Sequence, residues 1–382
     1  MQPPSPKVTA VSGLCQNALV VLSVLFCLQT VTAQIETVAP CLVPAGSVPL
    51  DGVEGRLDHL AVDVRSQRLF VSGLENHTIE VVDLAKRQRI HEITGISEPQ
   101  GLVFIPEKNR LMVCSRGDGT CRSFDANTFA EGPWVDLGRN ADNVRFAADS
   151  KIIYVGSGGE PGNGLLSAMD LALLLPVNQG GQPAEPHSPA DFRLDRPRQA
   201  DPRFEIQLPA HPESFQLDLA NRRIYVNVPD EHRIAVLDST LTNLTVAANW
   251  PVTVAEKNFA MALNADSARL YVACRKPPCL ASYDTRTGKL LSQTPCVGDA
   301  DDMFYDAKLK RIYIIGGEGY VDVFQVPATG EELAHLAHVP TAPRARTGLF
   351  IPDLQTLVVA RPHTTNGPAA VLVFNVKPQS SH

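Results

Sequence analysis

The chain has no excess of basic charge and no long apolar segment, and each shortage excludes a class of protein. Among its 382 residues, 34 Lys and Arg stand against 41 Asp and Glu, which gives a formal net charge of -7. Nucleic-acid-binding proteins need a basic surface to displace counterions, so we expect no nucleic-acid partner. A hydrophobic fraction of 44% is nevertheless sufficient for a folded core.

The longest apolar run lies near the N-terminus and predicts an export signal. Residues 18–28 are too few to cross a hydrocarbon core of about 30 Å as a helix. Val31 and Ala33 then occupy the -3 and -1 positions of a signal-peptidase site. We predict a signal peptide at residues 1–33, location in the periplasm or outside the cell, and no stable membrane insertion after cleavage. An uncleaved anchor is the alternative.

The cysteines lack the C-x-x-C spacing of zinc ribbons, and their number favours disulfides instead. Six remain after the signal, an even number in an oxidising compartment: Cys41, Cys114, Cys121, Cys274, Cys279 and Cys296. Cys114 and Cys121 flank a turn, and so do Cys274 and Cys279, so each pair is placed to bridge a hairpin. The six allow other pairings, and buried free thiols are the alternative.

A short pattern recurs along the mature chain: a basic or polar residue followed by three apolar ones, as in Arg68-Leu69-Phe70-Val71. The third residues of the copies are Phe70, Met112, Tyr154, Tyr225, Tyr271, Tyr313 and Val358. Their separations are 42, 42, 71, 46, 42 and 45 residues, and periods of this length are typical of propeller blades or helical arrays. Flanking segments such as 60–63 and 79–83 alternate with period two, which indicates strands. The sequence therefore predicts an all-β fold, a seven-bladed β-propeller of four-stranded antiparallel blades.

One separation is too long, and it predicts an insertion. The 71-residue gap contains a proline-rich segment at about 171–203. Asp170 matches Asp83 and Asp238 at the end of the third strand, so this irregular segment is expected between the third and outer strands of blade three. Residues 34–382 are otherwise predicted to form a single propeller domain.

Copies such as Arg-Ile-Tyr-Val at 223–226, with downstream Ile-x-Val-x-Asp strands, resemble the YVTN-repeat (YncE-like) β-propellers of the WD-repeat-like superfamily. The resemblance covers about residues 48–376 apart from the insertion. It implies that a strand after Ala33 supplies the outer strand of the last blade. Seven-bladed lactonases and the heavy subunits of quinoprotein amine dehydrogenases are similar in architecture, but no catalytic set of either matches this chain.

Polar residues precede the expected inner strand of every blade, and in a propeller these positions meet at one mouth of the central channel. A ring of such groups is the default location for a binding site. The candidate residues are Arg56, Asp58, His59, Glu98, Gln100, Asp142, Asn143, Arg145, His211, Glu213, Ser214, Asn258, Asp301, Asp302, Arg346 and Thr347. Turn capping is the alternative role for any single one of them.

Two kinds of ligand fit these residue types. Carboxylates and imidazoles favour a divalent cation, Ca²⁺ with oxygen ligands alone or Zn²⁺ or Mn²⁺ with histidine. The metal candidates are Asp58, His59, His211, Glu213 and Asp301. Arg56, Arg145 and Arg346 would instead bind a carboxylate or phosphate.

The favoured function is an exported binding or scaffold protein whose channel mouth receives a small molecule or a protein partner. The alternative is a metal-assisted hydrolase of lactone-like or ester substrates, with Glu98 or Glu213 as general base. The sequence identifies no nucleophile, and no cofactor other than the cation is implied.

Overall fold

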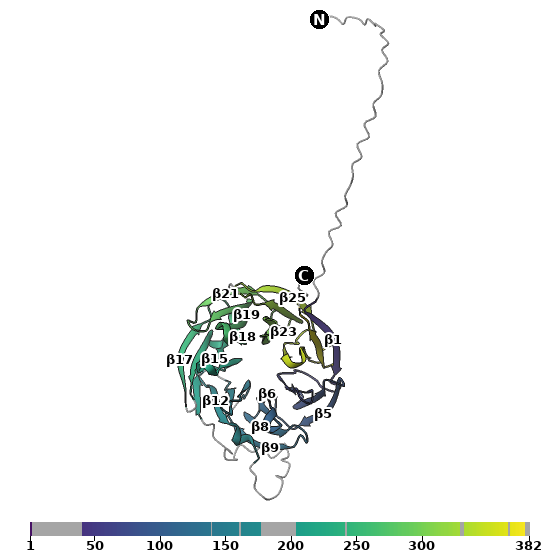
Figure 1. Ribbon diagram of the computed structural model, residues 1–382. Coiled ribbons are helices and arrows are strands. Elements are labelled where there is room, and N and C mark those ends of the chain that lie inside the picture. The colour runs from purple at the N-terminus through teal and green to yellow at the C-terminus, as the bar shows by residue number, and fades with distance from the viewer. Residues whose placement is uncertain are drawn as a thin grey trace, which may run out of the picture. The chain divides into compact units, whose positions relative to one another are not determined.

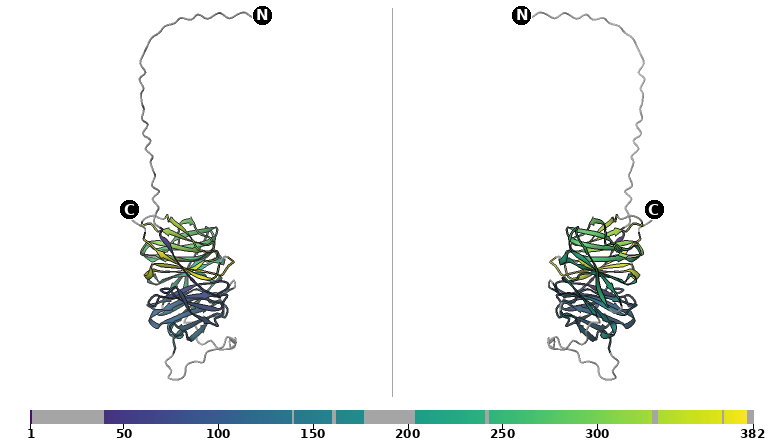
Figure 2. Two further views of the ribbon diagram at one scale, coloured as in Figure 1. Left: turned by 90° about the vertical axis from the view of Figure 1, so that its right-hand side faces the viewer. Right: turned by 90° about the vertical axis from the view of Figure 1, so that its left-hand side faces the viewer.

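Seven four-stranded antiparallel sheets form a ring (Figure 1), which confirms the predicted seven-bladed β-propeller. The computed structural model describes Met1 and residues 40–378, except 139, 160–161, 177–203, 241–242, 329–331 and 366. The predicted signal peptide, residues 1–33, lies outside the described residues apart from Met1, and so does most of the predicted insertion. Figure 2 shows the ring of blades edge-on.

The first strand of each blade lies nearest the axis and the fourth lies on the rim (Figure 1). The strands of blades one to four are β2 (Leu60–Asp63), β3 (Arg68–Gly73), β4 (Thr78–Asp83) and β5 (Gln88–Thr94); β6 (Pro99–Ile105), β7 (Arg110–Ser115), β8 (Thr120–Asp125) and β9 (Glu131–Asp136); β10 (Val144–Ala147), β11 (Ile152–Ser157), β12 (Gly164–Asp170) and β13 (Phe204–Leu208); and β14 (Phe215–Asp218), β15 (Arg223–Val228), β16 (Arg233–Ser239) and β17 (Leu244–Pro251).

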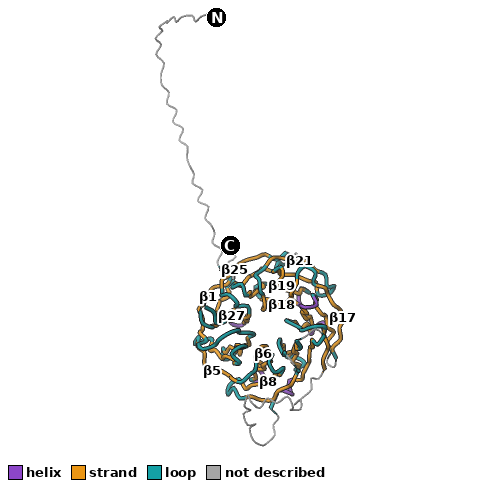
Figure 3. The backbone as a smooth tube through the Cα atoms, turned by 180° about the vertical axis from the view of Figure 1, so that it is seen from behind, coloured by secondary structure: helices purple, strands orange, loops and turns teal. Residues whose placement is uncertain are grey.

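Blades five to seven complete the ring. Their strands are β18 (Glu256–Asn264), β19 (Arg269–Lys276), β20 (Pro278–Asp284) and β21 (Leu290–Pro295); β22 (Ala300–Asp306), β23 (Arg311–Gly316), β24 (Tyr320–Gln325) and β25 (Ala334–Pro340); and β26 (Thr347–Ile351), β27 (Thr356–Arg361), β28 (Ala370–Val376) and β1 (Leu42–Pro49). The helical elements of the described residues are short 3-10 turns, drawn in purple in Figure 3: η1 (Pro106–Lys108), η2 (Leu171–Leu174), η4 (Leu219–Asn221), η5 (Pro229–Glu231), η6 (Ala265–Ser267) and η7 (Pro352–Leu354). In this described part of the chain, no helix has the length and apolar character needed to span a membrane.

The repeated apolar residues form the second strand of each blade and hold adjacent blades together. Successive strand side chains point to opposite faces of a sheet, so each blade presents apolar residues to both neighbours. Tyr225 of blade four, for example, packs among Leu270 and Val272 of blade five and is 1% exposed. A single blade cannot bury both of its faces, so burial is complete only in the ring.

The N-terminal strand closes this ring. β1 pairs antiparallel with β28, from Leu42 opposite Val376 to Pro49 opposite Ala370, and becomes the outer strand of blade seven. This is the arrangement that the family resemblance implied. Blade seven thus joins the two ends of the described propeller chain, which leaves no gap between the first and last blades.

The six cysteines are free thiols in the structure. The two predicted pairs nevertheless face each other across their hairpins: Cys114 lies opposite Cys121 on β7 and β8, and Cys274 lies opposite Cys279 on β19 and β20. All four are buried, as is Cys41, whereas Cys296 is half-buried.

Candidate functional site

All seven blades contribute to one polar pocket, here called the mouth pocket, with a volume of about 250 Å³. Its lining residues are Arg56, Gln100, Arg116, Asn140, Asp142, His211, Glu213, Phe259, Arg275, Asp301 and Arg346. Seven of these were predicted from their positions ahead of the inner strands. The remaining four, Asn140, Arg116, Phe259 and Arg275, were missed.

β-bulges at the start of three inner strands direct residues into this pocket. Pairing skips Asp301 between Ala300 and Asp302 in blade six, and it skips Phe259 in blade five. In blade two the register likewise shifts between Pro99 and Leu102, around Gln100. A bulge leaves one extra residue unpaired and turns its side chain away from the regular alternation. The pocket residue that the inner strand of each of these blades contributes is therefore set by a local irregularity of that strand.

Three acidic and imidazole groups from blades three and four lie together in the mouth pocket. Nε2 of His211 lies 3.3 Å from Oδ2 of Asp142. One ligand atom each of Asp142, His211 and Glu213 falls within 4.8 Å of the others. On its other side, the His211 ring contacts the carbonyl oxygen of Gly158 and the side-chain amide of Asn140. His211 is thus fixed at both ring nitrogens.

The charges of this cluster depend on one another. Burial lowers the pKa of His211, but the hydrogen bond that the ring donates to Asp142 outweighs this effect and raises the pKa to about 9. Burial, together with the charge on Asp142, raises the pKa of Glu213 to about 8. These shifts favour the charged form of His211, beside the Asp142 carboxylate, and the neutral form of Glu213.

A second group of charges adjoins the first. Asp58 is fully buried; its Oδ2 lies 2.8 Å from Nη2 of Arg56, and burial raises its pKa to about 6. His59 Nε2 lies 3.7 Å from Asp58 and from Asp142, and its Nδ1 lies 3.4 Å from Asp302. Burial lowers the pKa of His59, but the adjacent carboxylates raise it well above its ordinary value. Asp142 therefore links the two groups.

The opposite wall of the pocket is a set of arginines around Asp301. Its Oδ1 lies 2.8 Å from Nη2 of Arg275, and its Oδ2 lies 3.0 Å from Nε of Arg346 and 3.8 Å from Nη2 of Arg56. Arg275 also lies over the ring of Phe259, 3.6 Å from its centroid. These guanidinium groups are already paired with carboxylates of the protein.

The other candidates lie in different places. A second cavity of about 380 Å³ lies among the inner strands, and its polar lining residues are His59, Asn143, Arg145, Ser214, Gln216 and Asp302. Glu98 lines neither cavity; its side chain is exposed and lies 3.8 Å from Arg116. Asn258 is fully buried and donates to Asn227 and to the carbonyl oxygen of Arg233, which is a structural role.

The missed residues had only weak sequence signals. Arg275 ends the second strand of blade five, and Arg116 lies in the turn after β7. The far end of the second strand adjoins the start of the first in an antiparallel sheet, so polar residues at both positions reach the same mouth. The sequence prediction considered only the residues before the inner strands, so it did not include Arg116 and Arg275.

Two comparisons by sequence gave no match, whereas the fold has many counterparts. No family model matches the sequence, and no curated protein does. A structure titled "Kuenenia stuttgartiensis Hydrazine Synthase" is similar with a TM-score of 0.63 and 16% identity, over 87% of this chain and 100% of that one. A structure titled "Crystal Structure of Mitotic Checkpoint Complex" gives 0.65 and 10%, over 96% and 99%. At these identities the likeness shows the propeller fold alone.

Proposed function

We propose that this propeller is an exported binding protein whose mouth pocket receives a small polar ligand rich in hydrogen-bond donors, such as an amine. The observation that carries the proposal is a set of side-chain oxygen atoms that accept no hydrogen bond. Oδ1 of Asp142 and Oε1 of Gln100 are buried and accept no hydrogen bond from the described residues. The Glu213 side chain likewise has no hydrogen bond or ion pair within the described chain.

Buried acceptors without donors are costly, which is why native proteins satisfy nearly all of them. A ligand that brings donors into this pocket relieves that cost and would donate charge-assisted hydrogen bonds to Asp142 and, once it is ionised, to Glu213. The arginines favour an anion much less, because Arg275 and Arg346 are already bound to Asp301. The ligand class therefore follows from the unpaired groups rather than from the total charge of the pocket.

The test is calorimetric titration of the mature protein with a panel of small amines, amino sugars and dicarboxylates. We expect amines to bind and Glu213→Gln to weaken binding by at least about tenfold, the value of one charge-assisted bond. Glu98→Gln is the matched control, because Glu98 lies outside the pocket. Binding of dicarboxylates alone, or equal affinity in the Glu213 and Glu98 variants, would contradict the proposal.

A second candidate function, a metal-assisted lactone or ester hydrolase, is supported by the grouping of Asp142, His211 and Glu213. One imidazole and two carboxylates suit Zn²⁺ or Mn²⁺, and Oδ1 of Asp142, which accepts no hydrogen bond, fits a ligand role. Such a cation would polarise a substrate carbonyl. Of the other metal candidates, His59 contacts Asp142 of this cluster and Asp58 contacts His59, whereas Asp301 is paired with arginines.

Metal analysis separates the two functions. A stoichiometric cation that is lost in His211→Ala, together with ester hydrolysis lost in the same variant, would favour the hydrolase. Amine binding that is unchanged by chelators and accompanied by no hydrolysis would favour the binding protein.

We also propose export and a YncE-like family membership, on the apolar run and the repeat described above. Signal cleavage predicts a mature chain that begins at Gln34. In an oxidising compartment, the facing pairs Cys114–Cys121 and Cys274–Cys279 would form disulfides. N-terminal sequencing of the exported protein tests the cleavage site, and thiol counting tests the disulfides. An uncleaved N-terminus or six reactive thiols after denaturation would refute them.

A further inference from the structure

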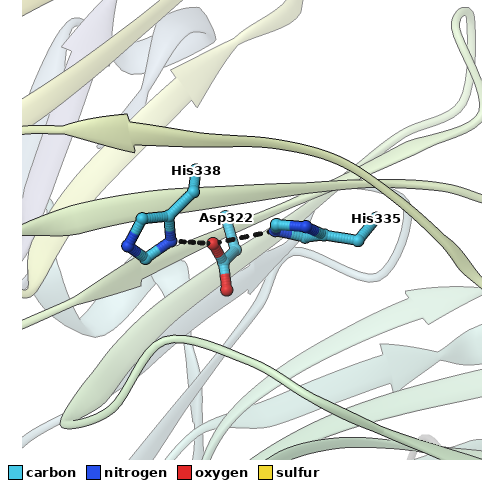
Figure 4. Close-up of side chains that lie close together, drawn as sticks. All are labelled: Asp322, His335 and His338. Atoms are coloured by element: carbon cyan, nitrogen blue, oxygen red, sulfur yellow. Dashed lines mark hydrogen bonds and ion pairs between the residues drawn. The ribbon is translucent and has the colours of Figure 1, made fainter.

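We propose that Asp322, His335 and His338 of blade six form a binding site for a divalent transition metal of the Zn²⁺ or Cu²⁺ class. The three side chains converge in Figure 4. His335 Nε2 lies 3.1 Å from Oδ1 of Asp322, and His338 Nδ1 lies 2.5 Å from the same oxygen. This group is distinct from the mouth pocket and lies on β24 and β25, the two outer strands of its blade.

A β-bulge makes this convergence possible. His335 and His338 are three residues apart, and on a regular strand they would point to opposite faces. The register shifts between Val323 and Phe324, so that His338 lies opposite Asp322 and His335 lies opposite Phe324. Because Asp322 and Phe324 share one face of β24, both imidazoles come to that same face.

The local contacts hold the ligands in a manner expected of a metal site. Oδ2 of Asp322 accepts the backbone N–H of Val297 at 2.6 Å, which leaves Oδ1 directed at the imidazoles. His338 stacks on Tyr320 with centroids 3.9 Å apart, and His335 contacts the Phe324 ring at 5.0 Å. Fixed carboxylates and oriented rings of this kind are typical of metal ligands and their surroundings.

Burial divides the site into a rigid base and an open side. The Asp322 side chain is 4% exposed, whereas those of His335 and His338 are 45% and 46% exposed. The nitrogen and oxygen atoms lie within 4.8 Å of one another. Ligand atoms at the corners of a tetrahedron around Zn²⁺ lie about 3.3 Å apart, and the two nitrogen–oxygen separations here are 3.1 and 2.5 Å. Solvent on the open side supplies the remaining ligand positions.

The equivalent positions of blades one and two hold ion pairs instead. In blade one the equivalent residues are Glu80, Arg89 and Glu92, and Arg89 contacts both carboxylates, at 2.8 and 3.3 Å. In blade two Arg122 contacts Glu131 at 3.4 Å. Guanidinium groups cannot bind a metal, whereas two imidazoles and one carboxylate are ligands that Zn²⁺ and Cu²⁺ prefer. Blade six alone of these three therefore carries a ligand set in place of an arginine ion pair.

The experiment is titration of the metal-stripped mature protein with Zn²⁺, followed by Cu²⁺ with electron paramagnetic resonance. We expect binding at micromolar metal and a Cu²⁺ spectrum with coupling to two imidazole nitrogens. The double variant His335→Ala/His338→Ala should bind at least about 100-fold more weakly at this site. His91→Ala is the matched control, because His91 is an exposed histidine on the outer strand of blade one.

Further variants separate this site from the mouth pocket. Both titrations are repeated with the His211→Ala variant, which should still bind one metal ion per protein at the blade-six site. Asp322→Asn keeps an oxygen for the Val297 N–H but removes the charge, and it should also weaken binding. Zn²⁺ affinity and stoichiometry that are the same in the double histidine variant and in the wild-type protein, or no binding at micromolar metal, would overturn the proposal. Circular dichroism confirms that each variant is folded.

Discussion

His211 and Asp142 join blade four to blade three at the mouth of the propeller. His211 Nε2 lies 3.3 Å from Asp142 Oδ2, and both side chains are largely buried. The contact brings together the loops that precede two inner strands, β14 and β10. It therefore fixes the geometry of the pocket and also contributes to the interface between the blades.

Loss of this contact should destabilise the propeller. His211→Ala leaves the Asp142 charge with fewer partners in a buried position, which costs about 3 kcal/mol. Urea unfolding of wild-type and variant protein measures the difference. His363→Ala is the control, because His363 is 44% exposed in its pair with Glu54 and should change stability by less than about 1 kcal/mol. Equal effects of the two substitutions would show that the His211 contact is not stabilising.

The repeat tyrosines should be indispensable to packing between blades. Tyr225→Ala removes a ring that is 1% exposed and lies 5.5 Å from Trp250, and we expect a loss of about 3–5 kcal/mol. Tyr225→Phe retains the ring and should lose only about 1 kcal/mol, the value of the hydrogen bond between the hydroxyl and Thr285. Thermal unfolding of both variants tests this. Indistinguishable melting temperatures for Tyr225→Ala and wild type would mean that the ring is not buried.

The effect of a substitution in the closing strand β1 on stability should depend on which face of the strand carries it. Val48 is fully buried between blades seven and one, whereas its neighbour Ser47 is exposed. Val48→Asp places an unpaired charge in the core and should cost more than about 3 kcal/mol. Ser47→Asp on the same strand should change stability by about 0.5 kcal/mol or less. If the two variants are equally stable, β1 does not pair in the register described.

Asp284 should make stability depend on pH in the acid range. Its carboxylate accepts hydrogen bonds from Arg286 and Thr287, and the Arg286 guanidinium bond and the Thr287 bonds hold its pKa at about 2. A folded-state pKa below the unfolded value gives stability that is present above about pH 4 and lost as the pH falls through about 2. Asp284→Asn should lose about 1 kcal/mol at pH 7.

Urea unfolding between pH 2 and pH 7 measures this dependence. The Asp284→Asn curve should approach that of the wild type at the acid end, because the wild-type carboxyl is then protonated. A constant difference between the two proteins across this range would contradict the ionic role of Asp284.

The sequence predicted the fold because the fold is a repeated local pattern. Arg223-Ile224-Tyr225-Val226 and its copies recur with a period set by four short strands, and alternation of side chains along a strand is independent of the rest of the chain. The same regularity placed the polar ring at the mouth, since equivalent positions of all blades lie at the same end of the axis. Fold class and blade number could therefore be predicted from the sequence alone.

Only the tertiary structure decided which of these groups meet. Asp301 and Phe259 reach the pocket through β-bulges, which shift register by one residue and leave no reliable trace in the sequence. Arg275 comes from a second strand and neutralises Asp301, and another bulge brings His335 to the same face as His338. Hydrogen bonds and ion pairs act over a few ångströms, whereas sequence pattern locates a residue only to a strand and a face. The chain by itself thus determined the architecture, and three-dimensional closure of the ring determined the chemistry.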